Sequence, residues 1–165
     1  MNNKEWAQMI YDAAKGMDMS PLFVTAQAAL ESGWGKSSIG NNIFGIKKGS
    51  GWIGKTKLVL THETFTLPNV KFALPEKVVT VTPMANGKYD YLAWLLFREY
   101  DSITDCLKDH FELLKSPQFA EDWQYRYDPV KFVQAIQEGK YHYATATNYV
   151  TIMDSMFKTV QKLVS

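Results

Sequence analysis

A helix whose two ends are both marked in the sequence constrains this fold more than any other feature. Ser20 and Pro21 are typical of an N-cap residue followed by proline at the first helical position. Apolar residues recur at helical spacing over residues 22–30, and Gly33 and Gly35 provide the stop. The segment therefore predicts a helix from Pro21 to about Glu31, rich in small apolar residues, that ends at the glycines.

Glu31 is the one carboxylate of this segment, and it falls in the last turn of the predicted helix. The negative end of the helix dipole and the neighbouring Trp34 both disfavour the ionised form, so the pKa of Glu31 should be raised. A carboxylic acid that stays protonated near neutral pH can protonate a leaving oxygen in glycoside hydrolysis. The alternative is a solvated surface glutamate at a helix end.

The rest of the chain predicts a mainly helical α+β domain over residues 1–165, with an inserted β-rich lobe at about residues 50–100. In that lobe Asn86-Gly87 is a hairpin signal. The apolar run 89–97 fits a strand or a buried helix by period, and the preceding turn favours a strand. Strands are also expected within residues 52–65 and 78–81, and further helices from near Trp6, Ser102, Pro129 and Tyr149.

Composition excludes several classes of function. The formal net charge is +1 without a long basic run, which argues against a nucleic-acid partner, and no apolar run is long enough for a membrane span. Cys106 is the only cysteine, so no intramolecular disulfide can form, and its surroundings predict a buried thiol. His62, His110 and His142 lack metal-ligand spacing, so we expect neither a metal nor another cofactor.

Motifs in a fixed order carry a resemblance to a known family. Leu-Glu-Ser-Gly-Trp-Gly at residues 30–35 is followed by Asn-Ile-Phe-Gly-Ile-Lys at residues 42–47. Thr-His-Glu lies at residues 61–63 and Phe-Arg-Glu-Tyr-Asp-Ser at residues 97–102. A last motif spans residues 143–149, beginning with Tyr-Ala-Thr and ending with Tyr149. The ordered set resembles the family 73 glycoside hydrolases, which are peptidoglycan N-acetylglucosaminidases of bacterial autolysins, a flagellar wall hydrolase and phage lysins.

The resemblance implies a lysozyme-like fold and roles for three residues. Glu31 would be the general acid, and Tyr149 would place its hydroxyl in the cleft. Glu63 would either activate water for inversion, act as a nucleophile, or leave capture of the anomeric carbon to the substrate's own 2-acetamido oxygen. Tyr149 also opens the apolar stripe of the last helix, and Glu63 could be an ordinary exposed strand residue.

Four further residues are expected to contact the glycan on the same grounds. Asn42 and Phe44 would line the groove, Tyr143 would be a sugar platform, and Trp34 would desolvate or support the acid. Phe44 fits the core equally well. Ala146 and Thr147 replace the Asp-Pro that the family often has, so the local loop geometry is expected to differ.

Together these features predict a hydrolase that cuts the β-1,4 bond after N-acetylglucosamine in peptidoglycan, with an endolysin-like role. We expect a monomer that is cytoplasmic at synthesis, since the N-terminus lacks the apolar region of a secretory signal, and that reaches the wall after release or lysis. The alternatives are a muramidase or lytic transglycosylase on the same fold, or a non-catalytic wall-binding or virion module.

Overall fold

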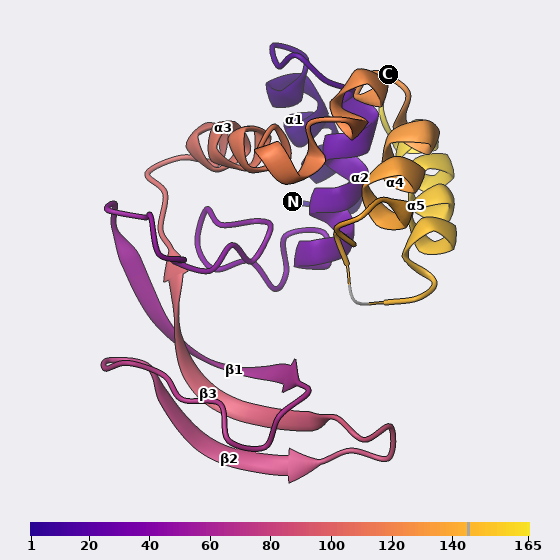
Figure 1. Cartoon of the computed structure of the whole chain (residues 1–165). Coiled ribbons are helices and arrows are strands. Elements are labelled where there is room, and N and C mark those ends of the chain that lie inside the picture. The colour runs from indigo at the N-terminus through magenta and orange to yellow at the C-terminus, as the bar shows by residue number, and fades with distance from the viewer. Residues whose placement is uncertain (145) are drawn as a thin grey trace. The chain divides into compact units, whose positions relative to one another are not determined.

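The computed structural model describes residues 1–144 and 146–165, and these form two compact units (Figure 1). The first unit combines residues 1–45 with residues 101–165, and it contains all the α-helices that the described residues form. The second unit, residues 46–100, contains the sheet. The chain thus leaves the helical unit after Gly45 and returns to it at Asp101.

The helical unit is built from five α-helices within the described residues, together with two short 3-10 helices, η1 and η2. α2 contacts α1, α4 and α5, and α4 contacts η2 and α5. The bounds are α1 Asn3–Ala14, α2 Pro21–Ser32, α3 Ile103–Leu114, η1 Pro117–Phe119, η2 Asp122–Tyr125, α4 Pro129–Glu138 and α5 Tyr149–Leu163.

α2 is the central helix of this unit, and its side chains are buried around most of its circumference. A helix that is buried on all sides needs apolar or small residues throughout, which explains the alanines at 26, 28 and 29. The Phe23 ring packs on Phe132 of α4 with centroids 4.9 Å apart, and on Phe157 of α5 at 6.4 Å. The helix predicted from Pro21 to about Glu31 is therefore confirmed as α2, and the structure shows that it forms the core of the helical unit.

The start of α2 follows the sequence prediction. Ser20 is the N-cap, its hydroxyl accepts a hydrogen bond from the Phe23 backbone N–H at 3.2 Å, and Pro21 occupies the first turn. The side chain satisfies one of the backbone donors that every helix N-terminus leaves without an intrahelical partner.

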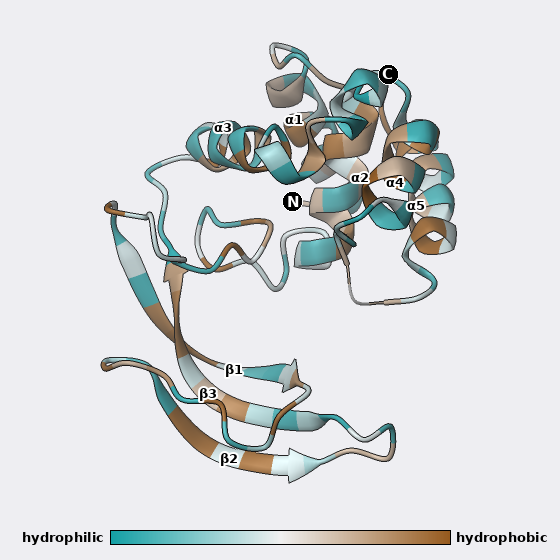
Figure 2. Ribbon diagram, viewed as in Figure 1, coloured by the Kyte–Doolittle hydropathy of each residue, from teal (hydrophilic) through white to brown (hydrophobic). Residues whose placement is uncertain are grey.

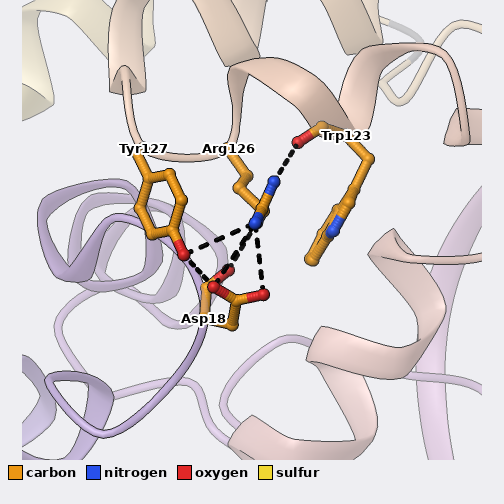
Figure 3. Close-up of polar contacts among 4 residues, drawn as sticks. All are labelled: Asp18, Trp123, Arg126 and Tyr127. Atoms are coloured by element: carbon orange, nitrogen blue, oxygen red, sulfur yellow. Dashed lines mark hydrogen bonds and ion pairs between the residues drawn. The ribbon is translucent and has the colours of Figure 1, made fainter.

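An arginine cluster formed by Asp18, Trp123, Arg126 and Tyr127 holds the residues that precede α2 (Figure 3). The guanidinium of Arg126 donates to the Asp18 backbone carbonyl at 2.9 Å and to the Asp18 carboxylate at 3.3 Å. The Tyr127 hydroxyl donates to the same carboxylate, and the guanidinium lies over the rings of Tyr127 and Trp123. The cluster links the loop between α1 and α2 to the segment that leads into α4.

Ser20→Ala should lower the free energy of unfolding by about 1 kcal/mol, because the Phe23 N–H loses its acceptor. Chemical denaturation followed by circular dichroism measures this change. Ser116→Ala is the matched control: the Ser116 hydroxyl is buried without a hydrogen bond within the described residues, so its loss should be neutral or stabilising. Equal destabilisation by both substitutions would contradict the capping role.

The second unit is a three-stranded antiparallel sheet in the order β1-β3-β2. β1 is Thr56–Phe65, β2 is Lys77–Pro83 and β3 is Tyr89–Arg98. The ambiguous run at residues 89–97 is thus a strand, and β2 joins it across the predicted Asn86-Gly87 turn. Asn86 stabilises that turn, since its side-chain oxygen accepts from the Lys88 N–H at 3.1 Å.

One face of β3 provides the core of the sheet unit. Tyr91, Ala93, Leu95 and Phe97 are buried at alternate positions, as the two-residue period of a strand requires. Figure 2 shows that hydrophobic residues occupy much of β3. The Tyr91 hydroxyl donates to the Leu67 carbonyl at 2.6 Å, which ties the connection between β1 and β2 to this face.

The structure differs from the sequence predictions in detail. α1 begins at Asn3 rather than near Trp6, because Asn2 and Glu5 form a capping box. At α3 only half of such a box forms: the Asp105 N–H donates to the Ser102 hydroxyl, while that hydroxyl donates to the Asp105 carboxylate. Neither 3-10 helix was predicted. Within the described part of the chain, the helices are too short or too polar to cross a membrane.

Candidate active site

Glu31 lies in the last turn of α2, with its side chain at the surface of the helical unit. Desolvation by the surrounding protein raises the pKa of its carboxyl group above the ordinary value of 4.5, even though part of the residue stays open to solvent. Within the described residues, its carboxylate makes no hydrogen bond or ion pair. The arrangement gives a proton donor that is accessible and is not held in its ionised form by a partner.

The turn after α2 is fixed by Ser32, which is buried. Its hydroxyl donates to the Ala28 carbonyl at 2.6 Å and accepts from the Gly35 N–H at 2.8 Å. Gly33 is the C-cap in the left-handed conformation, with φ of 55°. The predicted end of the helix is therefore confirmed. The two hydrogen bonds of Ser32 connect the last turn of α2, which carries Glu31, to the residues that follow it.

Trp34 adopts a positive φ of 61°, an unfavourable backbone conformation for a bulky side chain. Its ring packs edge-on against Trp6 of α1, with centroids 6.1 Å apart. Such strain persists only where the surroundings enforce it, and it concentrates at functional sites. Trp34 is thus locked three residues beyond Glu31, and its contact with a glycan stays a prediction.

Tyr149, the first residue of α5, is buried with its hydroxyl close to the end of α2. The hydroxyl accepts a hydrogen bond from Gln27 Nε2 at 2.9 Å. Burial raises the pKa of Tyr149 strongly, Gln27 opposes this in part, and the charge of Glu31 raises it further. The Tyr149 phenol therefore stays protonated, and it lies within electrostatic range of Glu31.

Tyr143 stacks on Tyr149 with ring centroids 5.7 Å apart. Burial of its hydroxyl raises the pKa well above 10, and Tyr149 and Glu31 add to that shift. Gln137 of α4 anchors the following residue: it donates to the Ala144 carbonyl at 2.8 Å and accepts from the Ala144 N–H at 2.9 Å. The structure thus brings Glu31, Tyr143 and Tyr149 together, while Thr145 of the same motif lies outside the described residues.

Asn42 and Phe44 are both buried in the helical unit. The Phe44 ring stacks on the His110 imidazole with centroids 3.7 Å apart and planes 15° apart. Phe44 therefore packs in the core, the second of the two roles that its sequence position allowed. Direct contact of either residue with a glycan stays a prediction.

Glu63 lies on β1, in the sheet unit, as the strand prediction required. Its carboxylate forms an ion pair with Lys47 at 2.9 Å, and the Lys47 ammonium lies 6.0 Å from the centre of the Phe65 ring. Lys47 is the last residue of the Asn-Ile-Phe-Gly-Ile-Lys motif, so two motifs of the sequence meet at this pair. The sheet unit thus presents Glu63 with a cationic partner.

Gln27 and His110 are site residues that the sequence analysis did not identify. Gln27 precedes Glu31 by four residues and therefore lies on the same side of α2, a spacing from which it could have been found. His110 Nε2 lies 2.6 Å from Gln27 Oε1, and this contact spans 83 residues of sequence. Sequence spacing offered no signal for that pairing.

The other candidate chemistries gain no support from the structure. Among the described residues, no group of His, Cys, Asp and Glu side chains is arranged to hold a metal ion. Cys106 is buried as predicted, and burial raises the pKa of its thiol to about 12. The Cys106 thiol is therefore protonated and unreactive at neutral pH.

The raised pKa of Glu31 predicts how stability depends on pH. Because the folded-state pKa lies above the unfolded value, the contribution of Glu31 is complete below pH 4.5 and is lost as the pH rises through the folded-state pKa. Glu31→Gln cannot ionise, so its melting temperature should rise relative to wild type between pH 4 and pH 8. Thermal unfolding across this range tests the prediction, and a difference independent of pH would contradict it.

The chain is similar to known proteins over most of its length. A sequence model described as Glucosaminidase, mannosyl-glycoprotein endo-beta-N-acetylglucosaminidase, matches residues 7–162. The peptidoglycan hydrolase FlgJ of Vibrio parahaemolyticus is 28% identical over 160 residues, which cover 93% of this chain and 44% of the relative. FlgJ of Escherichia coli strain K12 is 30% identical over 155 residues, covering 86% and 42%. This chain spans less than half the length of these relatives.

A solved structure agrees with the fold. The crystal structure of a peptidoglycan hydrolase mutant from Sphingomonas sp. A1 matches with a TM-score of 0.69 and 28% identity, over 98% of this chain and 96% of the other. The predicted fold class, a mainly helical α+β, lysozyme-like protein with a small β-lobe, is confirmed.

Proposed function

The chain belongs to the glucosaminidase family, and from this membership we propose that it hydrolyses peptidoglycan at the β-1,4 bond after N-acetylglucosamine. The membership confirms the resemblance of its motifs to the family 73 glycoside hydrolases. The observation that supports the reaction most directly is Glu31, a carboxyl group with a raised pKa at an accessible helix end. The relatives named peptidoglycan hydrolases supply the substrate class.

In the proposed reaction Glu31 donates its proton to the leaving glycosidic oxygen. The bond between that oxygen and the anomeric carbon breaks, and positive charge develops on the sugar. The resulting Glu31 carboxylate then lies near this charge. Water supplies the hydroxyl group that completes the new reducing end, and the remaining proton of that water restores the protonated form of Glu31.

Tyr149 is proposed to assist Glu31. Its phenol is protonated and lies within electrostatic range of Glu31, so it can donate a hydrogen bond to an oxygen of the bound sugar. Trp34, Asn42, Phe44 and Tyr143 are proposed to shape the surface on which the glycan lies, Phe44 by packing beneath it.

Glu63 is proposed as the second carboxylate, with the substrate acetamide as the alternative group that captures the anomeric carbon. A base that activates water requires carboxyl groups about 6.5–9.5 Å apart, and a direct nucleophile requires about 5–5.5 Å. Lys47 Nζ lies 2.9 Å from the Glu63 carboxylate and balances its charge. The endolysin-like role, the cellular location and the monomeric state stay predictions.

Incubation with purified peptidoglycan separates a hydrolase from a binding module. Wild-type protein should release soluble muropeptide fragments, whereas Glu31→Gln should bind insoluble peptidoglycan without releasing fragments. Sedimentation with the wall measures binding, and chromatography of the supernatant measures release. Binding by wild type with no release of fragments would replace this proposal with the wall-binding module.

A further inference from the structure

Three polar side chains from distant parts of the sequence meet inside the helical unit. Gln27 on α2, His110 on α3 and Tyr149 on α5 are 0%, 3% and 3% exposed. Their hydrogen bonds measure 2.6 Å between His110 Nε2 and Gln27 Oε1, and 2.9 Å between Gln27 Nε2 and the Tyr149 hydroxyl. Buried polar groups are costly unless they are paired, so this chain of contacts holds its members in defined orientations.

The direction of the hydrogen bonds follows from chemistry. Burial lowers the pKa of His110 to about 3, so the imidazole is neutral and carries one N–H. Gln27 Oε1 can only accept, so His110 Nε2 must donate to it. The amide nitrogen of Gln27 then faces Tyr149 and donates to its oxygen. Stacking on Phe44 fixes the plane of the imidazole.

The Tyr149 oxygen thus accepts a hydrogen bond, and its own hydrogen remains to be donated. No acceptor for that hydrogen lies within the part of the chain that the structure describes. The chain of contacts prevents the phenol from donating inward, because the group that faces it is itself a donor. The hydrogen is therefore available to an atom of a bound substrate, at a phenol that lies within electrostatic range of Glu31.

We propose that Gln27 and His110 are positioning residues that hold the Tyr149 hydroxyl as a hydrogen-bond donor to the bound glycan. This inference rests on the proposed function, because it places Tyr149 at the site where Glu31 acts. Gln27 and His110 are buried, and in this proposal they affect catalysis only through the Tyr149 hydroxyl.

A double-mutant cycle tests the proposal. Gln27→Met removes the amide at similar volume, and Tyr149→Phe removes the hydroxyl. We expect each to lower kcat for peptidoglycan cleavage by about 10-fold or more, with little change in KM. If Gln27 acts through the hydroxyl, the double variant should be within about two-fold of Tyr149→Phe. Multiplied effects, or a Gln27→Met variant with wild-type kcat, would overturn the proposal.

His110→Phe tests the same proposal at a second residue, so the test does not depend on whether Gln27→Met folds. A phenyl ring can still stack on Phe44, but it cannot donate to Gln27, whose amide can then turn its oxygen toward Tyr149. The phenol would donate inward, so kcat should fall in the wild-type background and should not fall further when Tyr149→Phe is present. A further fall in that background would contradict the proposal.

Thr25→Val is the matched control for a buried polar group on α2. Its hydroxyl donates to the Pro21 carbonyl at 2.8 Å and is fully buried, but it takes no part in the chain to Tyr149. It should lower the melting temperature and leave kcat unchanged. Loss of kcat in step with melting temperature across all variants would assign Gln27 and His110 a purely structural role. An inactive wild type, or an active Glu31→Gln, would instead refute the proposed function.

Discussion

Glu31→Gln should lower kcat for peptidoglycan cleavage by about 100-fold to 10,000-fold, the range that general acid catalysis contributes. Glutamine has nearly the same shape as glutamate but has no carboxylic proton to give to the leaving oxygen. The side chain lies at the surface and makes no hydrogen bond within the described residues, so the fold should tolerate the change. Initial rates of reducing-end formation at saturating substrate measure the effect.

The control for this prediction is an exposed glutamate elsewhere on the helical unit. Glu112→Gln on α3 removes the same charge and should retain wild-type kcat. A loss of similar size in both variants would indicate a general charge effect. A Glu31→Gln variant within about three-fold of wild type would remove Glu31 from the role of general acid.

Gly35→Ala should lower the free energy of unfolding by about 2–4 kcal/mol. Gly35 has φ of 80°, and an added Cβ would lie 2.4 Å from Trp6 Nε1. The indole cannot move aside cheaply, because Trp6 is buried and packs on Trp34. For a chain of this length the melting temperature should fall by roughly 5–15 °C, as measured by calorimetry or circular dichroism.

Gly40→Ala separates the contact from the backbone cost. Gly40 has a similar positive φ of 58°, but an added Cβ would meet no atom within 4 Å. Gly40→Ala should therefore lower the free energy of unfolding only by the conformational penalty, about 1–2 kcal/mol, which is less than the effect of Gly35→Ala. An equal fall in the free energy of unfolding in the two variants would show that the close approach of Trp6 to Gly35 does not add to the cost of the substitution.

The helices of the chain were predictable because their signals are local. Ser20, Pro21 and Gly33 mark the ends of α2 by chemistry within a few residues, and Asp128 caps α4 in the same way. The capping box of Asn2 and Glu5 was visible in the sequence as well, and its omission explains the late predicted start of α1. The 3-10 helices lack a comparable periodic pattern, since each spans only three or four residues.

The candidate site was predictable only in part, for a related reason. Glu31 was predictable because the sequence marks the helix end on which it lies. Its pKa is raised as predicted, and the cause that the structure gives is desolvation by the surrounding protein. The partners of Gln27 lie 83 and 122 residues away, and only the packing of α2 against distant helices brings them together. The ion pair between Lys47 and Glu63 likewise depends on how the sheet unit folds.

The most direct test of the proposed reaction is mass spectrometry of borohydride-reduced products from a peptidoglycan digest by wild type and Glu31→Gln. Wild type should release fragments that end in reduced N-acetylglucosamine, and the folded variant should release none. Fragments that end in reduced muramic acid, or in its anhydro form, would contradict the assigned bond and place the chain with the muramidases or lytic transglycosylases.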